Sequence, residues 1–327
     1  RNTLGWIRAN AGKRSERIIV IGAHLDHIGY GKASSRAKKS QKGKMHPGAD
    51  DNASGISALL EIAEYLMALK KKGLLKSNYD ILIAAWSGEE IGLLGSAHFT
   101  RVLGLGKSQS KKRKVISYLN LDMVGRYKDK LTLHGIGSSP AWKRLIQRAN
   151  IPVGLNLNLQ KDSHIPTDTT SFFPKGVPIL SAFTGLHPDY HSPSDTPEKI
   201  NYEGVADCAK LYVRLVEGMV LLENMDYVAQ APPPKSRGKL RVYLGTIPDY
   251  SQTDRKGLLL SGVSKGGPAD LAGLQSEDLV IELGGKKVET IYDYTDAIST
   301  LTAGQQSGVT IIRKGKTLQL KITPSSR

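Results

Sequence analysis

The chain has 327 residues, of which 39% are hydrophobic, so it is long and apolar enough to form two globular domains. It contains no run of about twenty apolar residues, so no membrane-spanning segment is expected within it. The net charge is +16, but the lysine-rich stretches at 32–44 and 107–114 lack aromatic residues on which bases stack. We therefore predict solvated basic loops there and no specific nucleic-acid partner.

The single cysteine, Cys208, excludes an internal disulfide and any cysteine-based zinc site. It occupies an apolar position in a predicted helix, which indicates a buried structural thiol. The chain begins at Arg1 with neither an initiator methionine nor a signal peptide, so we expect a fragment or a processed form.

Strands and helices are predicted to alternate along the first 223 residues. The predicted strands cover 17–23, 78–85, 114–122, 131–134 and 177–183, and the predicted helices cover 56–72, 92–103, 141–149 and 201–223. This alternation is typical of an α/β sandwich, in which functional side chains gather after the ends of the strands.

A stretch rich in proline, residues 229–238, divides the sequence. We predict a catalytic domain over 1–228, this segment as a stiff linker, and a small β-rich domain over 239–327. Beyond the linker, short apolar runs at 239–245, 257–263, 279–283, 309–314 and 317–322 predict strands. Two helices are expected among them, near 268–273 and 294–301.

The pair Glu89-Glu90 follows the apolar run 81–85, so two carboxylates stand at the end of a buried strand. Successive side chains of a strand point to opposite faces, so one carboxylate can hold a metal while the other handles a proton. The alternative is a solvated turn whose acidic residues stabilise the start of the next helix.

Other acidic and histidine side chains also follow predicted strand ends. The full set is His24, Asp26, Asp51, Glu89, Glu90, Asp122 and His191. Carboxylates and imidazoles without cysteine suit two zinc ions, with cobalt or manganese as substitutes. Two such ions, about 3.5–4 Å apart, share a carboxylate, activate a water and polarise a carbonyl oxygen. The predicted reaction is hydrolysis of an amide or ester.

Five motifs stand in an order that closely resembles the di-zinc aminopeptidases, the zinc exopeptidases typified by secreted bacterial leucyl aminopeptidases. They are His24-x-Asp26, Gly48-Ala49-Asp50-Asp51-Asn52-x-Ser54-Gly55, Glu89-Glu90, Leu121-Asp122-Met123 and Tyr190-His191-Ser192. The resemblance covers residues 4–223. It implies a mixed central sheet between helices, and peptide substrates with a free N-terminus.

The resemblance also implies a role for each motif residue. Asp51 bridges the two zinc ions; His24 and Asp122 complete one site, and Glu90 and His191 complete the other. Glu89 is the implied general base, which takes the proton from the bridging water and passes it to the leaving amine.

Three finer expectations follow from the resemblance. The carboxylate of Asp26 is implied to orient the ring of His24. The hydroxyl of Tyr190 is implied to contact the substrate carbonyl oxygen, and the peptide bond between Asp51 and Asn52 is expected to be cis.

The sequence departs from the family pattern in the segment 167–172, where Asp168 is kept but Thr169 replaces the usual histidine. Asp50 is predicted to point away from the metals and to cap the following helix. The remaining histidines match no motif and are predicted to be structural or exposed. They are His27, His46, His98, His134, His164 and His187.

Residues 240–325 resemble a PDZ domain of the type appended to bacterial periplasmic proteases. Leu244, Gly245 and Thr246 match its carboxylate-binding loop, and 263–280 matches its most characteristic stretch. The resemblance implies that a peptide C-terminus binds as an added strand. Thr246 replaces the usual bulky apolar residue, and a purely structural module is the alternative.

These observations predict a metal-dependent aminopeptidase with a PDZ domain, exported to the periplasm, the cell surface or the medium. Three alternatives stay open. They are a carboxypeptidase or glutaminyl cyclase on the same fold, a catalytically silent binding protein, and an envelope scaffold built around the PDZ domain.

Overall fold

A computed structural model describes residues 1–9, 15–31, 35–37, 39–41, 43–106, 114–231, 242–249 and 256–326. The chain forms two compact units, the first from Arg1–Thr184 and Asp189–Ala231 and the second mainly from Pro232–Arg327. The predicted linker lies outside the described residues from position 232 onward, and so do most of the predicted basic loop at 107–114 and parts of that at 32–44.

A seven-stranded mixed sheet forms the centre of the first unit, with the strand order β1-β3-β2-β4-β7-β5-β6. The strands are β1 (Thr3–Ile7), β2 (Arg17–His24), β3 (Asp80–Trp86), β4 (Lys114–Leu121), β5 (Leu131–His134), β6 (Leu157–Gln160) and β7 (Ile179–Phe183). The four central strands β3, β2, β4 and β7 are parallel, whereas β1 and β5 run antiparallel to their neighbours β3 and β7. The carboxyl ends of the four central strands therefore meet at one edge.

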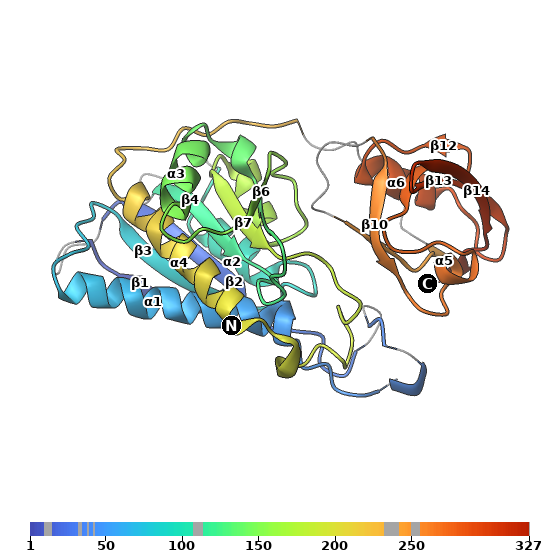
Figure 1. The fold of residues 1–327 in the computed structure, drawn as a ribbon. Coiled ribbons are helices and arrows are strands. Elements are labelled where there is room, and N and C mark those ends of the chain that lie inside the picture. Colours follow the sequence, from blue (N-terminus) through green and yellow to red (C-terminus); the bar gives the residue numbers. More distant parts are fainter. Residues whose placement is uncertain are drawn as a thin grey trace. The chain divides into compact units, whose positions relative to one another are not determined.

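Helices cover both faces of this sheet (Figure 1). They are α1 (Gly55–Lys71), α2 (Leu94–Val102), α3 (Ala141–Asn150) and α4 (Tyr202–Met219). Ile19 and Ile21 of β2 pack into the cluster that contains α1, α3 and α4, whereas Ile18 and Val20 pack into the cluster of Phe99 on α2. The alternation of side chains along an apolar strand thus produces the predicted sandwich.

Two strands of the first unit were not predicted. The edge strand β1 is mostly exposed and contains a glycine, so its apolar pattern is weak, and β6 is only half buried. Cys208 lies buried in α4, and burial raises the pKa of its thiol to about 12, which confirms the prediction of an inert thiol.

The second unit is a small β-rich domain. Its strands are β8 (Val242–Tyr243), β9 (Thr246–Pro248), β10 (Leu258–Val263), β11 (Leu279–Leu283), β12 (Lys286–Lys287), β13 (Ser307–Arg313), β14 (Lys316–Ile322) and β15 (Ser325–Ser326), and its helices are α5 (Pro268–Leu271) and α6 (Ile291–Ser299). It has its own core, which includes Leu260, Val280 and Ile311. The buried carboxylate of Asp278 accepts two hydrogen bonds from Arg313 on β13.

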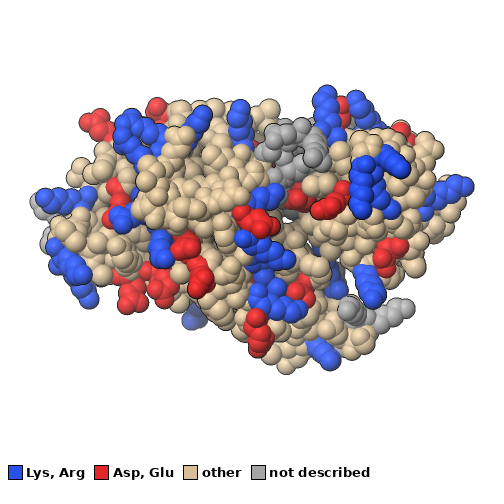
Figure 2. Space-filling model, in the orientation of Figure 1, with Lys and Arg blue, Asp and Glu red and all other residues tan. Residues whose placement is uncertain are grey.

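Charged side chains of both signs are scattered over the face drawn in Figure 2. Lysines and arginines do not form one continuous stripe among the described residues on that face. Of the helices in the described ranges, none combines the length and the apolar character that a membrane crossing requires.

Candidate metal centre

The residues predicted as metal ligands meet at the carboxyl edge of the parallel strands. His24 is the last residue of β2, Asp122 follows β4, and Glu90 follows β3 after a short turn. Asp51 lies in the helical turn Ala49–Ser54 that leads into α1, and His191 lies in the loop after β7. The topology thus brings five distant segments to one place.

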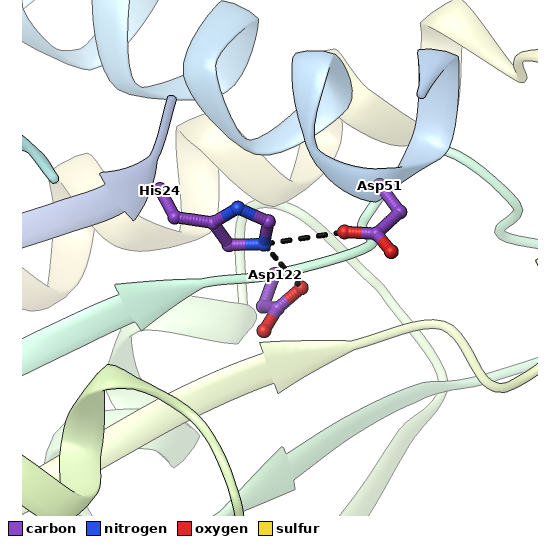
Figure 3. Close-up of side chains that lie close together, drawn as sticks. All are labelled: His24, Asp51 and Asp122. Carbon is purple, nitrogen blue, oxygen red and sulfur yellow. Dashed lines mark ion pairs between the residues drawn. The ribbon is translucent and has the colours of Figure 1, made fainter. Parts of the chain in front are cut away.

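One group consists of His24, Asp51 and Asp122. The Nε2 atom of His24 lies 3.2 Å from Oδ1 of Asp51 and 3.5 Å from Oδ1 of Asp122. Figure 3 shows this nitrogen of the ring directed toward both carboxylates. Three ligand atoms that converge in this way surround a position where a cation fits.

A second group shares Asp51 with the first. Nε2 of His191 lies 3.1 Å from Oδ2 of Asp51 and 3.1 Å from Oε2 of Glu90. The two oxygens of Asp51 therefore face different imidazoles, His24 on one side and His191 on the other. This is the arrangement that a bridging carboxylate needs.

His27 was predicted to be structural or exposed, but it lies at the site, where it forms with Asp51 and Glu90 a group that could hold a metal ion. Its Nδ1 atom lies 2.9 Å from Oε1 of Glu90 and 3.8 Å from Oδ2 of Asp51. The signal that would have revealed it is its position three residues after His24, on the same segment beyond the end of β2.

Asp26 supports the site in a different way from the one predicted. The Nδ1 atom of His24 lies 3.0 Å from the backbone oxygen of Asp26, so main chain and not side chain orients the ring. The Asp26 carboxylate instead accepts hydrogen bonds from the backbone N–H groups of Glu89 (3.1 Å) and Glu90 (3.3 Å). It therefore fixes the turn that carries the Glu-Glu pair.

Glu89 stands beside the groups without belonging to either of them. Its carboxylate makes no hydrogen bond or ion pair with the described residues. Burial and the nearby negative charge of Asp122 raise the pKa of Glu89 to about 9. A carboxylate that readily takes up a proton therefore lies next to the convergent ligands.

The charges of the site call for a cation. Burial lowers the pKa of His191, but hydrogen bonds with Asp51 and Glu90 outweigh this and raise it to about 9. Burial raises the pKa of Asp51, but hydrogen bonds with His191 and His24 outweigh this and lower it. Protonated imidazoles thus balance the negative charge of the carboxylates. A bound zinc ion would supply this positive charge in place of the protons. This donor set fits zinc.

A second layer of polar groups holds the segment of Asp51. The buried carboxylate of Asp195 accepts hydrogen bonds from the backbone N–H groups of Asp50 (2.9 Å) and Asp51 (3.2 Å) and from Arg126 (2.8 Å). The peptide bond between Asp51 and Asn52 is cis, as predicted. The sequence analysis missed Asp195, although it lies only four residues after His191.

Asp50 does not cap α1, in contrast to the prediction. Its Oδ1 atom accepts hydrogen bonds from the backbone N–H of Gly125 (2.6 Å) and from the hydroxyl of Ser54 (3.0 Å). It therefore connects the turn before α1 to the segment after Asp122.

Tyr190 stacks on the ring of His191, with 3.9 Å between the ring centroids. The guanidinium of Arg36 lies 4.9 Å from the centroid of the Tyr190 ring. The backbone N–H of Arg36 donates a hydrogen bond to the backbone oxygen of His191 (2.8 Å). The loop between His24 and Asp51 is thereby attached to a ligand segment. This geometry leaves the predicted contact of Tyr190 with a substrate untested.

Asp168 is buried, and neither of its oxygens has a hydrogen-bond partner among the described residues. Burial, with the negative charges of Asp122 and Asp26, raises its pKa to about 7. Thr169, which replaces the usual histidine, hydrogen-bonds to the hydroxyl of Thr167 (2.9 Å) and is fully buried. The side chain of Thr169 therefore has a structural role.

The sequence model of Peptidase family M28 matches residues 3–216 of the chain, which include every ligand described above. This protein belongs to peptidase family M28. A PDZ domain model matches residues 244–323, and the second unit is a PDZ domain. Both findings confirm the resemblances that the motifs indicated.

Relatives of this M28 chain carry names of the same kind. A probable leucine aminopeptidase of Arthroderma benhamiae is 28% identical over 212 residues, which cover 63% of this chain and 55% of that protein. An aminopeptidase structure from Aneurinibacillus sp. strain AM-1 has 27% identity and a TM-score of 0.52, over 69% of this chain and 50% of that one. BSAP, a zinc aminopeptidase from Bacillus subtilis, has 25% identity and a TM-score of 0.52, over 68% of this chain and 50% of that one. The chain spans about half the length of these proteins.

In the PDZ domain, Leu244, Gly245 and Thr246 occupy the turn that leads into β9. Leu244 is buried, and Gly245 has a φ of 76°, a conformation that favours glycine. The hydroxyl of Thr246 hydrogen-bonds to that of Tyr294 on α6 (2.8 Å), and Tyr294 is buried. A pair of hydroxyls therefore links the start of β9 to α6.

Proposed function

We propose that this chain is a metal-dependent aminopeptidase that holds two zinc ions and releases N-terminal residues from peptides. The observation that carries the proposal is the sharing of Asp51 between two groups of ligands, with one carboxylate oxygen facing His24 and the other facing His191. The names of the M28 relatives support the same activity.

In this proposal His24, Asp122 and Asp51 would hold the first ion, and Asp51, Glu90 and His191 would hold the second. Zinc bound there would supply polarisation of the scissile carbonyl and a lower pKa for the attacking water. The surrounding carboxylates give the site a negative field that attracts the protonated N-terminus of a peptide.

Glu89 is the proposed general base and acid. Its carboxylate forms no hydrogen bond or ion pair within the described ranges, and it lies where the charges of Asp122 and His24 act on it. Positive charge bound beside it would lower this pKa from about 9, because positive charge favours the ionised form. It can then take a proton from water and donate it to the leaving amine.

Asp26 is a proposed positioning residue for this step. Its carboxylate holds the backbone of Glu89 and Glu90, while its backbone oxygen holds the ring of His24. Tyr190 is proposed to contact the substrate carbonyl, for which its place beside His191 is the support.

We propose a peptide C-terminus as the ligand of the PDZ domain. The turn at Leu244, Gly245 and Thr246 supports this, because a glycine in such a turn lets backbone N–H groups face a carboxylate. The hydroxyls of Thr246 and Tyr294 favour a small or polar final residue over a bulky apolar one. We also propose that the protein acts after export, in the periplasm, at the cell surface or in the medium.

Zinc content and hydrolysis of aminoacyl chromogenic substrates, with and without chelator, test the catalytic proposal. We expect two zinc ions per chain, with activity that chelator abolishes. The variant Glu89→Gln should keep both ions and lose about 10²–10⁴-fold in kcat. Glu64→Gln, at an exposed position on α1, is the matched control and should be unchanged.

The alternatives predict other results. A single tightly bound ion would favour a glutaminyl cyclase. Two ions without aminoacyl hydrolysis would favour a carboxypeptidase, and the same panel should include blocked peptides with free C-termini. No tightly bound metal in the folded chain would overturn the proposal and favour a binding protein.

A further inference from the structure

The ring of His27 lies between the two carboxylates of the second ligand group. Its Nδ1 atom is 2.9 Å from Oε1 of Glu90, and its ring meets that of His191 edge to face at a centroid distance of 5.6 Å. The metal ligands implied by the family motifs do not include this histidine. Its role therefore has to be found from its contacts.

The two oxygens of Glu90 have different partners. Oε2 lies 3.1 Å from Nε2 of His191, whereas Oε1 lies 2.9 Å from Nδ1 of His27. Because an ionised carboxylate only accepts hydrogen bonds, Nδ1 of His27 must carry the proton in this contact. The ring of His27 thus occupies one oxygen and leaves the other beside His191.

The backbone of Gly48 holds the ring of His27 in place. A Cβ atom at position 48 would lie 2.6 Å from Cγ and 2.7 Å from Cδ2 of His27, so the main chain packs directly against the ring. The Nε2 atom of His27 is buried and has no hydrogen-bond partner in the part of the chain that the structure describes. No polar contact therefore competes with Glu90 for the orientation of the ring.

We propose that His27 is a positioning residue for Glu90: it holds Oε1 so that only Oε2 faces the metal ion on the side of His191. This inference rests on the proposed function, because it assumes metal at both halves of the site. In this role His27 is a hydrogen-bond donor and His191 the ligand, because Nδ1 of His27 lies 2.9 Å from Glu90 but 3.8 Å from the bridging Asp51, whereas Nε2 of His191 lies 3.1 Å from both.

A ligand that is free to rotate binds its ion less tightly, and loss of such an orienting partner typically lowers metal affinity about 10–100-fold. The close polar contact of His27 is with Glu90, which belongs to the second group alone, and the shared Asp51 lies farther away, at 3.8 Å. Removal of His27 should therefore weaken one of the two ions and leave the other nearly unchanged.

The experiment is a competition titration of the metal-free full chain with zinc and a chromophoric chelator, which resolves the two dissociation constants. In His27→Ala we expect one constant to rise about 10–100-fold and the other to change less than about twofold. His27→Gln, which keeps an N–H donor, should restore most of the affinity. His27→Leu fills the space without a donor and should behave like the alanine variant.

His98→Ala is the control, because His98 is exposed on α2, outside the ligand segments, and hydrogen-bonds to Arg101 (3.0 Å). It should leave both constants unchanged. Circular dichroism of each metal-free variant checks the fold, and if His27→Ala unfolds, the comparison of the leucine and glutamine variants decides. Visible absorption of the cobalt-loaded protein gives a second readout, with one of the two signals lost in the leucine variant.

Each outcome bears on one proposal. Two equally tight ions in His27→Ala and His27→Leu would overturn this inference alone, and so would equal weakening of both ions. A glutamine variant as weak as the leucine variant would also overturn it, in favour of direct ligation. A wild-type chain that binds fewer than two ions would overturn the proposed function as well.

Discussion

The two halves of the candidate metal centre are built differently. His24 and Asp122 stand at or just after the ends of the neighbouring strands β2 and β4, so the sheet itself fixes their separation. Glu90 and His191 stand on loops, and His191 adopts a left-handed backbone with a φ of 52°. Additional contacts hold the loop-borne half: His27 bonds to Glu90, the ring of Tyr190 stacks on that of His191, and the backbone N–H of Arg36 donates to the oxygen of His191.

The difference shows where precision comes from in such a site. Ladder hydrogen bonds hold a strand end, so a backbone oxygen is enough to orient His24. A loop has no ladder, so side chains must supply the constraint. The following experiments test this contrast, from the largest expected effect to the smallest.

Replacement of Asp51 should affect the strand-borne and loop-borne halves alike, because both halves share this residue. In Asp51→Asn we expect loss of both zinc ions and a fall in kcat/KM of at least about 10³-fold, since metal polarisation supplies several kcal/mol to the transition state. Zinc content after gel filtration and steady-state kinetics check this. Retention of one full equivalent of zinc would show that the halves are independent, contrary to expectation. Asp207→Asn, at a surface pair with Lys210 on α4, is the control.

Replacement of Asp195 should weaken both halves together, in contrast to replacement of His27. Asp195→Asn removes the charge that faces Arg126 and loosens the backbone of Asp51, so we expect similar losses of affinity for both ions. The free energy of unfolding should fall by about 3–5 kcal/mol, because Arg126 loses its buried partner. The chelator titration and urea denaturation measure these changes.

Asp189→Asn provides the matched control for Asp195. Asp189 also pairs with Arg126 (3.5 Å) but makes its closer contact with Lys199 (2.6 Å) on a partly exposed surface. We expect unchanged zinc affinities in this variant. A loss of only one ion in Asp195→Asn would contradict the role of Asp195 as a support for the shared ligand.

Asp168 should give the strand-borne half a dependence on pH. Burial raises the pKa of Asp168 to about 7, so the folded state binds a proton that the unfolded state releases near pH 4. The contribution of Asp168 to the free energy of unfolding of the metal-free chain should therefore fall as pH rises from about 4 to about 7, by roughly 1.4 kcal/mol per pH unit, and then level off. Glu89 and His191, whose pKa values are raised to about 9, contribute separately, in the wild type and in an Asp168 variant alike. Asp168→Asn should remove this slope, which denaturation at several pH values measures. Parallel pH profiles for the two proteins would refute the assignment.

The strand-borne half was the easier part to predict from sequence. The apolar runs before His24 and Asp122 mark buried parallel strands, and the carboxyl ends of such strands meet at one edge. The Glu-Glu pair was placed by the same reasoning, and the family motifs supplied Asp51 and His191.

The supporting contacts could not be read from the sequence in the same way. The backbone oxygen of Asp26, and not its carboxylate, orients His24, because the turn after β2 directs that oxygen toward the ring. His27 has a partner only because the turn after β3 brings Glu90 to it, and Asp195 only because its loop folds back over Asp51. Such contacts depend on loop conformation, which neither periodicity nor spacing determines.

The order of events during folding follows from the distribution of the ligands. They come from separate segments between His24 and His191, and they meet only after β2, β3, β4 and β7 have paired. Contacts between residues far apart in the sequence form slowly, so we expect the chain to assemble its sheet before all five ligands can hold ions together. Ions that bind after the rate-limiting step leave the folding rate unchanged and slow unfolding. The metal centre would then stabilise the completed fold kinetically and would not nucleate folding.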